Sequence, residues 1–169
     1  MQTNQTPFND QSVNTTGCCA KFNPAGWDAQ ELHFKDKPFV RASTLSIGHV
    51  PLNMGVVYAR VQGHIEKADA GDPSQELVMS RDPSAFTGEH LFAVKSPVAD
   101  EEMIAVSGEF LTKVFEGPYS AVRGWHGQMQ ALAREKGREP KQVWFYYTTC
   151  PDCAKAYGAN PVVGLVELA

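Results

Sequence analysis

The sequence predicts an α+β domain made of two strand–helix–strand–strand modules related by a pseudo-two-fold repeat. Two observations predict it. Segments of strand length, rich in β-branched and aromatic residues, alternate with two longer segments whose apolar residues recur every three or four positions. The order of these segments is the same in both halves of the chain. Because neither half buries its own sheet face alone, we expect one antiparallel-sheet domain with two helices.

The 169 residues are expected to form one domain with an N-terminal extension. Residues 1–17 are rich in Asn, Gln and Thr and lack periodicity, which predicts a disordered tail. The folded domain should cover residues 18–169. Within it, residues 18–37 predict an arm that packs across the domain, because they carry large apolar side chains without a regular period. The first module then spans residues 38–100 and the second residues 101–169.

The first module begins at residues 39–47, whose β-branched content and length are typical of a strand. Pro51 favours a helix start, since the N–H that proline lacks would be unpaired in the first turn. Residues 76–80 and 90–95 follow as two strands joined by a polar loop. The apolar face of the helix is expected to contain Leu52, Val56, Val57, Val61, Ile65 and Ala68.

The second module repeats this order. Residues 103–115 predict a strand, and a tight turn leads into a helix over residues 120–136, whose first residue is a serine that can cap it. Gly137 lies where a helix C-terminal glycine belongs. Residues 143–149 and 161–168 are the last two strands, with a short helical turn expected at 152–157 between them.

Composition excludes several classes of function. The formal net charge is −4 and the sequence has no run of Lys or Arg, so we expect no nucleic-acid partner. No apolar stretch approaches the roughly 18 residues needed to cross a bilayer. The N-terminus lacks the charged start and apolar core of a signal peptide. These features predict a cytoplasmic protein without a membrane partner, as a monomer or homodimer.

The most specific local pattern is GEFLxxVFEGPY at residues 108–119, a strand followed by a Gly-Pro-Tyr turn and a helix. With the repeated module, it resembles the GyrI-like (gyrase-inhibitor-like) small-molecule-binding superfamily over residues 39–168. The paired cysteines and the stretches 49–55 and 150–158 are similar to a bacterial stand-alone subgroup. This superfamily includes multidrug-sensing effector domains, stand-alone binders and hydrolases of cyclopropane-containing compounds.

The resemblance implies an aromatic cleft between the two modules. Multidrug-sensing members carry a cation-binding Glu in the strand that corresponds to residues 143–149, where this chain has four consecutive aromatic residues and no acid. A preference for cationic drugs is therefore not implied. On a strand, two of the four side chains point to each face, so one pair can fill the core while the other lines a cleft. Ordinary core packing is the alternative for the whole set of ligand candidates: Tyr58, Tyr119, Trp125, Trp144, Phe145, Tyr146 and Tyr147.

The candidate catalytic residues are Glu109, Glu116 and Tyr119, which flank or close the Gly-Pro-Tyr turn. A carboxylate beside an aromatic pocket can have a raised pKa and act as a general acid or base. In a hydrolase of electrophilic small molecules, one Glu would activate water while Tyr119 or Tyr146 steadies the leaving group. The alternative is two solvated acids at the strand edge. His49, before the first helix, and His126, on the second helix, could each shuttle protons, and a satisfied polar group or cap is the alternative for both.

Four cysteines form two close pairs, Cys18-Cys19 and Cys150-Pro-Asp-Cys153. Together they could supply the four ligands of a structural zinc site. The second pair has the spacing of a dithiol redox motif as well. Adjacent cysteines are unusual zinc ligands because neighbouring side chains diverge, so reduced thiols that pack the arm against a loop remain the third alternative.

The function that these patterns favour is a stand-alone binder of small hydrophobic or amphipathic molecules, with no required cofactor. One alternative is a hydrolase of electrophilic, cyclopropanoid-type small molecules that uses a cleft Glu to activate water. A second alternative is a zinc or thiol sensor that works through the paired cysteines. Phosphate-binding glycine loops and the HExxH motif are absent from the sequence, which leaves nucleotide hydrolysis and zinc proteolysis without support.

Overall fold

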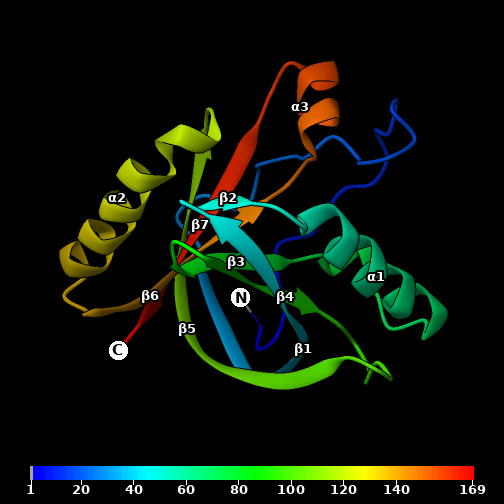
Figure 1. Ribbon diagram of the computed structural model, residues 1–169. Helices are drawn as coiled ribbons and strands as arrows, with labels where there is room; N and C mark the ends of the chain where they lie inside the picture. The colour runs from blue at the N-terminus through cyan, green and yellow to red at the C-terminus, as the bar shows by residue number, and fades with distance from the viewer. Residues whose placement is uncertain (1) are drawn as a thin grey trace.

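A closed antiparallel sheet organises the computed structural model, which describes residues 2–169 (Figure 1). The sheet order is β2-β1-β4-β3-β6-β7-β5, and β1 additionally pairs with β5. This additional pairing closes six strands into a barrel and leaves β2 as a short extension. The strands are β1 (Glu31–Ile47), β2 (Val50–Pro51), β3 (Val78–Ser84), β4 (Thr87–Ala93), β5 (Glu102–Glu116), β6 (Pro140–Tyr147) and β7 (Pro161–Leu168).

Helices lie on the outside of the barrel, with α1 and α2 on opposite sides of the view in Figure 1. The order β1-α1-β3-β4 is followed by β5-α2-β6-β7, which confirms the predicted α+β fold with its repeated module. No helix among residues 2–169 is long and apolar enough to span a membrane. The helices are α1 (Met54–Lys67), α2 (Val122–Glu135) and α3 (Pro151–Tyr157), with 3₁₀ turns η1 (Pro73–Gln75) and η2 (Tyr119–Ala121).

The barrel interior holds the largest hydrophobic cluster, to which all six strands contribute. Phe39 of β1, Phe110 of β5 and Leu165 of β7 are each at most 1% exposed. Two residues of the N-terminal arm, Phe22 and Trp27, complete this cluster from outside the strands. Phe22 and Trp27 therefore close the interior that the strands leave open.

Two further clusters cover the outer face of the barrel, one under each long helix. Val57 and Val61 of α1 pack on Val40 and Phe92 of the first module. In the second module, the α2 residues Trp125 and Met129 lie against the outward side chains of β5, β6 and β7. Each helix thus buries one apolar stripe, in agreement with the three- and four-residue spacing in the sequence.

Strand β1 starts at Glu31, eight residues before the predicted position, and includes part of the predicted arm. The pairing of β1 with β5 shifts register between Phe34 and Lys37, and Asp36 within the shift has a φ of 49°. A bulge of this kind breaks the two-residue alternation that marks a strand in a sequence. Phe34 and Phe39 consequently face the same interior although an odd number of positions separates them.

Both predicted helix starts are wrong by two or three residues. Pro51 pairs with Ser46 in β2, so α1 begins at Met54, and the predicted face residues Leu52 and Val56 are exposed. Ser120 does not cap α2, because it lies inside η2 and the helix begins after it. Gly137, with a φ of 72°, follows the last turn of α2 as predicted, since glycine adopts this left-handed conformation without steric cost.

The N-terminal segment, predicted as a disordered tail, has defined hydrogen-bond partners in the structure. The Asn4 side chain bridges the backbone of Lys35 on β1 through both its nitrogen and its oxygen. Thr6 is buried and bonds to the Gln75 side chain in η1. Asparagine and threonine side chains make such backbone-like bonds, and hydrophobic periodicity does not record them.

Gly164 of β7 provides a direct test of the packing under α2. A Cβ atom at this position would lie 2.8 Å from the Met129 Sδ atom and 2.9 Å from Phe115 Cε2. We expect Gly164→Ala to lower the free energy of unfolding by about 1–3 kcal/mol through overpacking. Gly127→Ala is the matched control on α2, because a Cβ there meets nothing within 4 Å and alanine favours a helix. Urea denaturation of both variants measures the difference, and equal stability would contradict the close packing.

Candidate functional site

The four consecutive aromatic residues of β6 divide between the two faces of the barrel wall. Trp144 and Tyr146 point into the interior, where Tyr146 packs 5.7 Å from the Trp27 ring and 6.0 Å from the Phe22 ring. Phe145 and Tyr147 point outward. The inward pair therefore belongs to the core, and only the outward pair lies on the face where the two modules meet.

On the outer face, two of the predicted aromatic ligand residues, Tyr119 and Tyr147, lie near the surface. Trp125 stacks on Phe115 at 5.0 Å and is 7% exposed, so it is part of the packing under α2. Phe145 is buried beside it. Tyr147 contacts the Tyr119 ring at 5.8 Å, and Tyr119 is 48% exposed. These two tyrosines are the outward aromatic residues of the second module that a ligand at the surface can approach.

Polar side chains of the first module lie against these tyrosines. Strand β3 pairs with β6 through Ser80 and Phe145, which brings the two modules edge to edge (Figure 1). We call the residues along this edge the seam. The seam consists of His49, Tyr58, Ser80, Asp82, His90, Tyr119 and Tyr147.

Asp82 is the carboxylate of the seam, and its Oδ2 atom has two partners. The Tyr119 hydroxyl donates a hydrogen bond to it at 3.2 Å, and His49 Nδ1 lies 3.4 Å away. Tyr119 comes from the second module, whereas His49 and Asp82 belong to the first. The tyrosine hydroxyl also lies 3.3 Å from the His49 carbonyl oxygen. This arrangement joins an acid, an imidazole and a phenol from three separate segments of the chain.

A buried histidine lies below this group. His90 Nδ1 lies 2.8 Å from the Ser80 hydroxyl and 3.1 Å from the Tyr58 hydroxyl, and its Nε2 lies 3.0 Å from the Thr44 hydroxyl. Burial lowers the pKa of His90 to about 4, so the ring is neutral near pH 7. A neutral imidazole has one donor and one acceptor nitrogen, and the surrounding hydroxyls satisfy both. The network holds the Tyr58 side chain in position.

Gly88 makes room for this arrangement. A Cβ atom on Gly88 would lie 2.4 Å from the Thr44 hydroxyl oxygen, 3.1 Å from His90 Nε2 and 3.6 Å from Asp82 Oδ1. The buried network and the Asp82 carboxylate therefore both pack against the backbone of Gly88, where a side chain would not fit.

The tyrosines of the seam are held in their protonated form. Burial, followed by the charge of Asp82, raises the pKa of Tyr119 to about 12. Burial also raises the pKa of Tyr147 well above its usual value, with Tyr119, Asp82 and Tyr58 adding to the effect. The pKa of Tyr58 is raised by burial as well. Perturbed groups gathered at one place are typical of functional sites, and these phenols remain proton donors at neutral pH.

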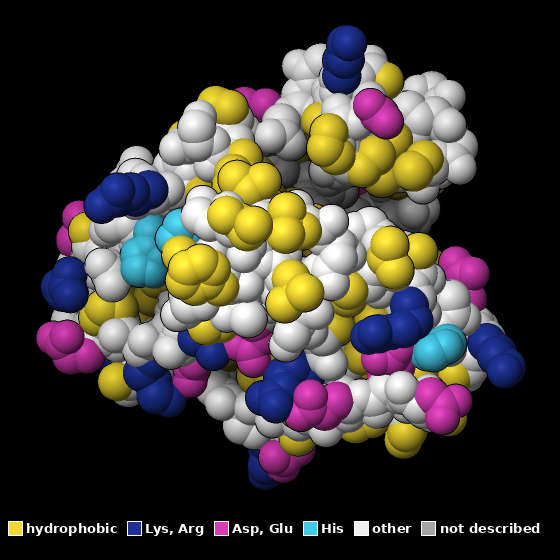
Figure 2. All heavy atoms as spheres, in the orientation of Figure 1, with side chains coloured by type: hydrophobic (Ala, Val, Ile, Leu, Met, Phe, Trp, Pro, Cys, Tyr) yellow, Lys and Arg dark blue, Asp and Glu magenta, His cyan; other side chains and the backbone are white. Residues whose placement is uncertain are grey.

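Exposed apolar side chains flank His49 of the seam in the sequence, and one more lies at Phe86, beside the Ala85 carbonyl that accepts the His49 N–H. They gather in the centre of the face shown in Figure 2, over β2 and the start of α1. Each is more than 60% exposed, which is unusual for so many large apolar residues on one surface. We call this set the apolar rim; it consists of Leu45, Ile47, Val50, Leu52, Val56 and Phe86.

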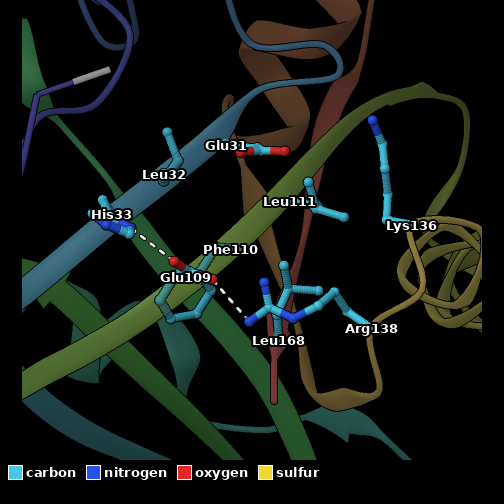
Figure 3. Close-up of a pocket in the computed structure, with 9 residues that line it drawn as sticks. All are labelled: Glu31, Leu32, His33, Glu109, Phe110, Leu111, Lys136, Arg138 and Leu168. Carbon is cyan, nitrogen blue, oxygen red and sulfur yellow. Dashed lines mark ion pairs between the residues drawn. The ribbon is translucent and has the colours of Figure 1, made fainter.

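The two predicted catalytic glutamates lie outside the seam. Glu109 lines a pocket of about 170 Å³ at one end of the barrel, where Arg138 holds it at 2.8 Å and His33 at 3.6 Å (Figure 3). Glu116 accepts a hydrogen bond from the backbone N–H of Asn160 at the end of β5. Of the three predicted catalytic residues, the structure therefore places only Tyr119 beside the other titratable groups of the seam.

A second pocket of about 240 Å³ opens from the barrel interior. Met79, Leu91 and Trp144 contribute to its wall. Arg81 crosses it, 2.6 Å from Glu89 and 4.9 Å from the centre of the Trp144 ring. Neither of the two pockets lies at the seam.

The four cysteines come together as predicted. Cys18 and Cys19 from the arm meet Cys150 and Cys153 at the start of α3, and all four sulfur atoms lie within 4.8 Å of one another. The adjacent cysteines do not diverge, because the chain bends continuously over residues 15–19. This cluster could hold a metal ion.

Comparison with known proteins identifies the family. Residues 9–168 match the model of a family described as "Bacterial hydrolase". The chain belongs to this bacterial hydrolase family. No curated protein matches its sequence. Among solved structures, an uncharacterised conserved protein from Listeria innocua is similar, with a TM-score of 0.57 and 8% identity over 85% of this chain and 93% of that chain. At this identity the likeness shows the fold alone, and the GyrI-like resemblance stays a prediction.

In this member of the bacterial hydrolase family, sequence reasoning missed Asp82, Ser80 and His90. It placed residues 81–89 in a loop, whereas β3 continues to Ser84. On a continued strand, Ser80 and Asp82 share one face. Two polar residues in alternation beside an aromatic strand are the signal that could have located the seam.

The buried histidine predicts a pH-dependent stability. Between pH about 6.5 and 4, the unfolded chain binds a proton at His90 that the folded chain does not bind. We therefore expect the free energy of unfolding to fall by up to about 3 kcal/mol as the pH is lowered through this range. In the His90→Gln variant this contribution is absent, so its stability should change less with pH. Urea denaturation across this pH range compares the two proteins, and identical pH slopes would rule out a neutral buried His90.

Proposed function

We propose that the protein hydrolyses small apolar electrophiles at the seam between its two modules. The observation that carries this proposal is the Asp82 carboxylate, which contacts both His49 Nδ1 and the Tyr119 hydroxyl. Membership of the bacterial hydrolase family supports hydrolysis as the reaction class. The apolar rim supports an apolar or amphipathic substrate, because burying such surface against a ligand is favourable.

In the proposed reaction, His49 is the general base. Asp82 orients the ring through Nδ1, which leaves Nε2 to take a proton from a water molecule. The resulting hydroxide attacks the electrophilic carbon, and the bond from this carbon to the leaving atom breaks. The leaving atom takes its electron pair and a proton from the Tyr119 phenol, which is protonated at neutral pH because its pKa is about 12. The proton on His49 then returns to the phenolate, and the site is restored.

The remaining seam residues position the substrate. Tyr58 is fixed by the buried His90 network, and Tyr147 is fixed against Tyr119. Tyr147 offers an aromatic ring and a hydroxyl to an amphipathic ligand, whereas the Tyr58 hydroxyl is engaged by Ser80 and His90 and supports the site from below. This division of roles requires no metal or organic cofactor.

Binding without turnover is the second candidate for the same site. The apolar rim favours it, since six exposed apolar side chains support ligand capture whether or not chemistry follows. In that case Asp82 and His49 would recognise a polar group of the ligand rather than activate water. The two functions differ only in whether the bound compound is consumed.

Substitution of Asp82 tests the hydrolytic mechanism. We expect Asp82→Asn to reduce kcat by about 10²–10⁴-fold with KM nearly unchanged, because the amide no longer stabilises the imidazolium that forms on His49. The measurement is the rate of product formation from a panel of activated aryl esters and cyclopropane-containing electrophiles. Glu109→Gln is the matched control, since it removes a carboxylate in the barrel-end pocket away from the seam.

Three results separate the alternatives. A loss of turnover in Glu109→Gln equal to that in Asp82→Asn would move the reaction away from the seam. Full activity of Asp82→Asn would rule out Asp82 as the residue that orients and supports the proposed base, His49. Saturable binding of panel compounds, measured by calorimetry, without consumption by the wild-type protein would establish the binder instead.

A further inference from the structure

We propose that Cys18, Cys19, Cys150 and Cys153 bind one zinc ion in a closed structural site that fastens the N-terminal arm to the start of α3. The four cysteines play no part in the proposed reaction at the seam, and the two ligand pairs are separated by more than 130 positions in the chain. Their convergence is the feature that the rest of the fold leaves unexplained.

The distances fit a tetrahedral ion. Zinc bound to thiolates at about 2.3 Å requires sulfur atoms about 3.8 Å apart. The sulfur atoms of Cys18 and Cys19 are 3.7 Å apart, and all four lie within 4.8 Å of one another. All four cysteines are free thiols, whereas disulfide partners would lie at about 2.05 Å. Four free thiols at this spacing fit the ligand set of one tetrahedral zinc ion.

Local backbone geometry directs the sulfur atoms of both cysteine pairs toward the same place. Cys150 precedes α3 and Cys153 lies in its first turn, so the Cys-x-x-Cys spacing places both sulfurs on one side of the helix. The bend over residues 15–19 turns Cys18 and Cys19 toward them. The Tyr157 hydroxyl donates a hydrogen bond to the Cys19 carbonyl at 2.7 Å, which holds the arm against α3 independently of any sulfur contact.

Four thiolates complete the coordination of zinc. A catalytic zinc ion keeps one position open for water, whereas a site with four cysteine ligands has none. Soft sulfur ligands favour zinc over magnesium or calcium, which prefer oxygen. The chemistry of this donor set therefore assigns the site a structural role.

The site would stabilise the part of the chain that seals the barrel. Phe22 and Trp27, a few residues after the arm cysteines, fill the interior against Tyr146. An ion that joins the arm to α3 would restrict the motion of this segment at its N-terminal end, next to residues 1–17. Loss of the ion should loosen the arm without changing the seam, because the hydrogen bonds around the cysteines join the segment near Cys19 to α3.

The first measurement is the metal content of protein purified without chelator. We expect about one zinc per chain by elemental analysis, the stoichiometry of a single four-cysteine site. Replacement of zinc by cobalt should produce the intense visible absorption of tetrahedral cobalt thiolate. Metal-free protein that is fully folded, with all four thiols reactive toward a thiol reagent, would overturn the proposal. A mass lighter by two hydrogen atoms for each disulfide would overturn it as well.

Variants then locate the ligands. Cys153→Ser should abolish the cobalt thiolate spectrum and increase proteolytic cleavage within residues 18–30. Asp152→Asn is the matched control, because Asp152 is an exposed residue between the two α3 ligands and lies outside the sulfur cluster. It should keep both the metal and the resistance to protease. If Cys153→Ser does not fold, Cys18→Ser replaces it, since Cys18 is exposed and its substitution removes a ligand without opening the core. Zinc retained at full stoichiometry by a folded cysteine variant would contradict the four-ligand site.

Discussion

The pairing of β1 with both β4 and β5 is the constraint on which the rest of the structure depends. It closes the sheet, and closure gives every strand an inside and an outside. β1 is long enough for both tasks, with 17 residues and a bulge near Asp36 that allows it to curve. The interior is then filled by one continuous cluster, and polar chemistry is confined to the outer face and the ends of the barrel.

The seam is the place on that outer face where the two modules meet without a helix covering them both. Its polar groups are arranged in two layers. The lower layer is the His90 network, in which burial excludes the charged imidazole and hydroxyl groups satisfy both ring nitrogens. The upper layer is the more exposed group around Asp82, where proton transfer to and from water is feasible. In the proposed reaction, the buried His90 network would hold the groups around Asp82 in position for the substrate.

The arm contributes to the barrel in addition to the six strands, because its side chains fill the interior. Besides the aromatic packing of Trp27, its backbone is tied to β5, since the Trp27 carbonyl accepts a hydrogen bond from the Thr112 hydroxyl and Asp28 accepts one from the backbone N–H of Val114. A segment that has buried aromatic residues but no helix or strand of its own gains stability from a cross-link to another part of the fold. The cysteine cluster is located where such a fastening acts on the arm and on α3 together.

The sequence by itself determined the fold class, the repeated module and the convergence of the cysteine pairs as one possible metal site. It did so because strand alternation, helical spacing and ligand types are local properties of neighbouring residues. Tertiary structure alone decided that Tyr146 points into the core while Tyr147 points outward toward the proposed site, since the direction of each face depends on barrel closure. It also decided which acid lies beside Tyr119: Asp82 is 37 positions away in the chain, whereas Glu116, three positions away, bonds to a loop. Proximity between strands of different modules is set by the register of β3 against β6, which no local pattern encodes.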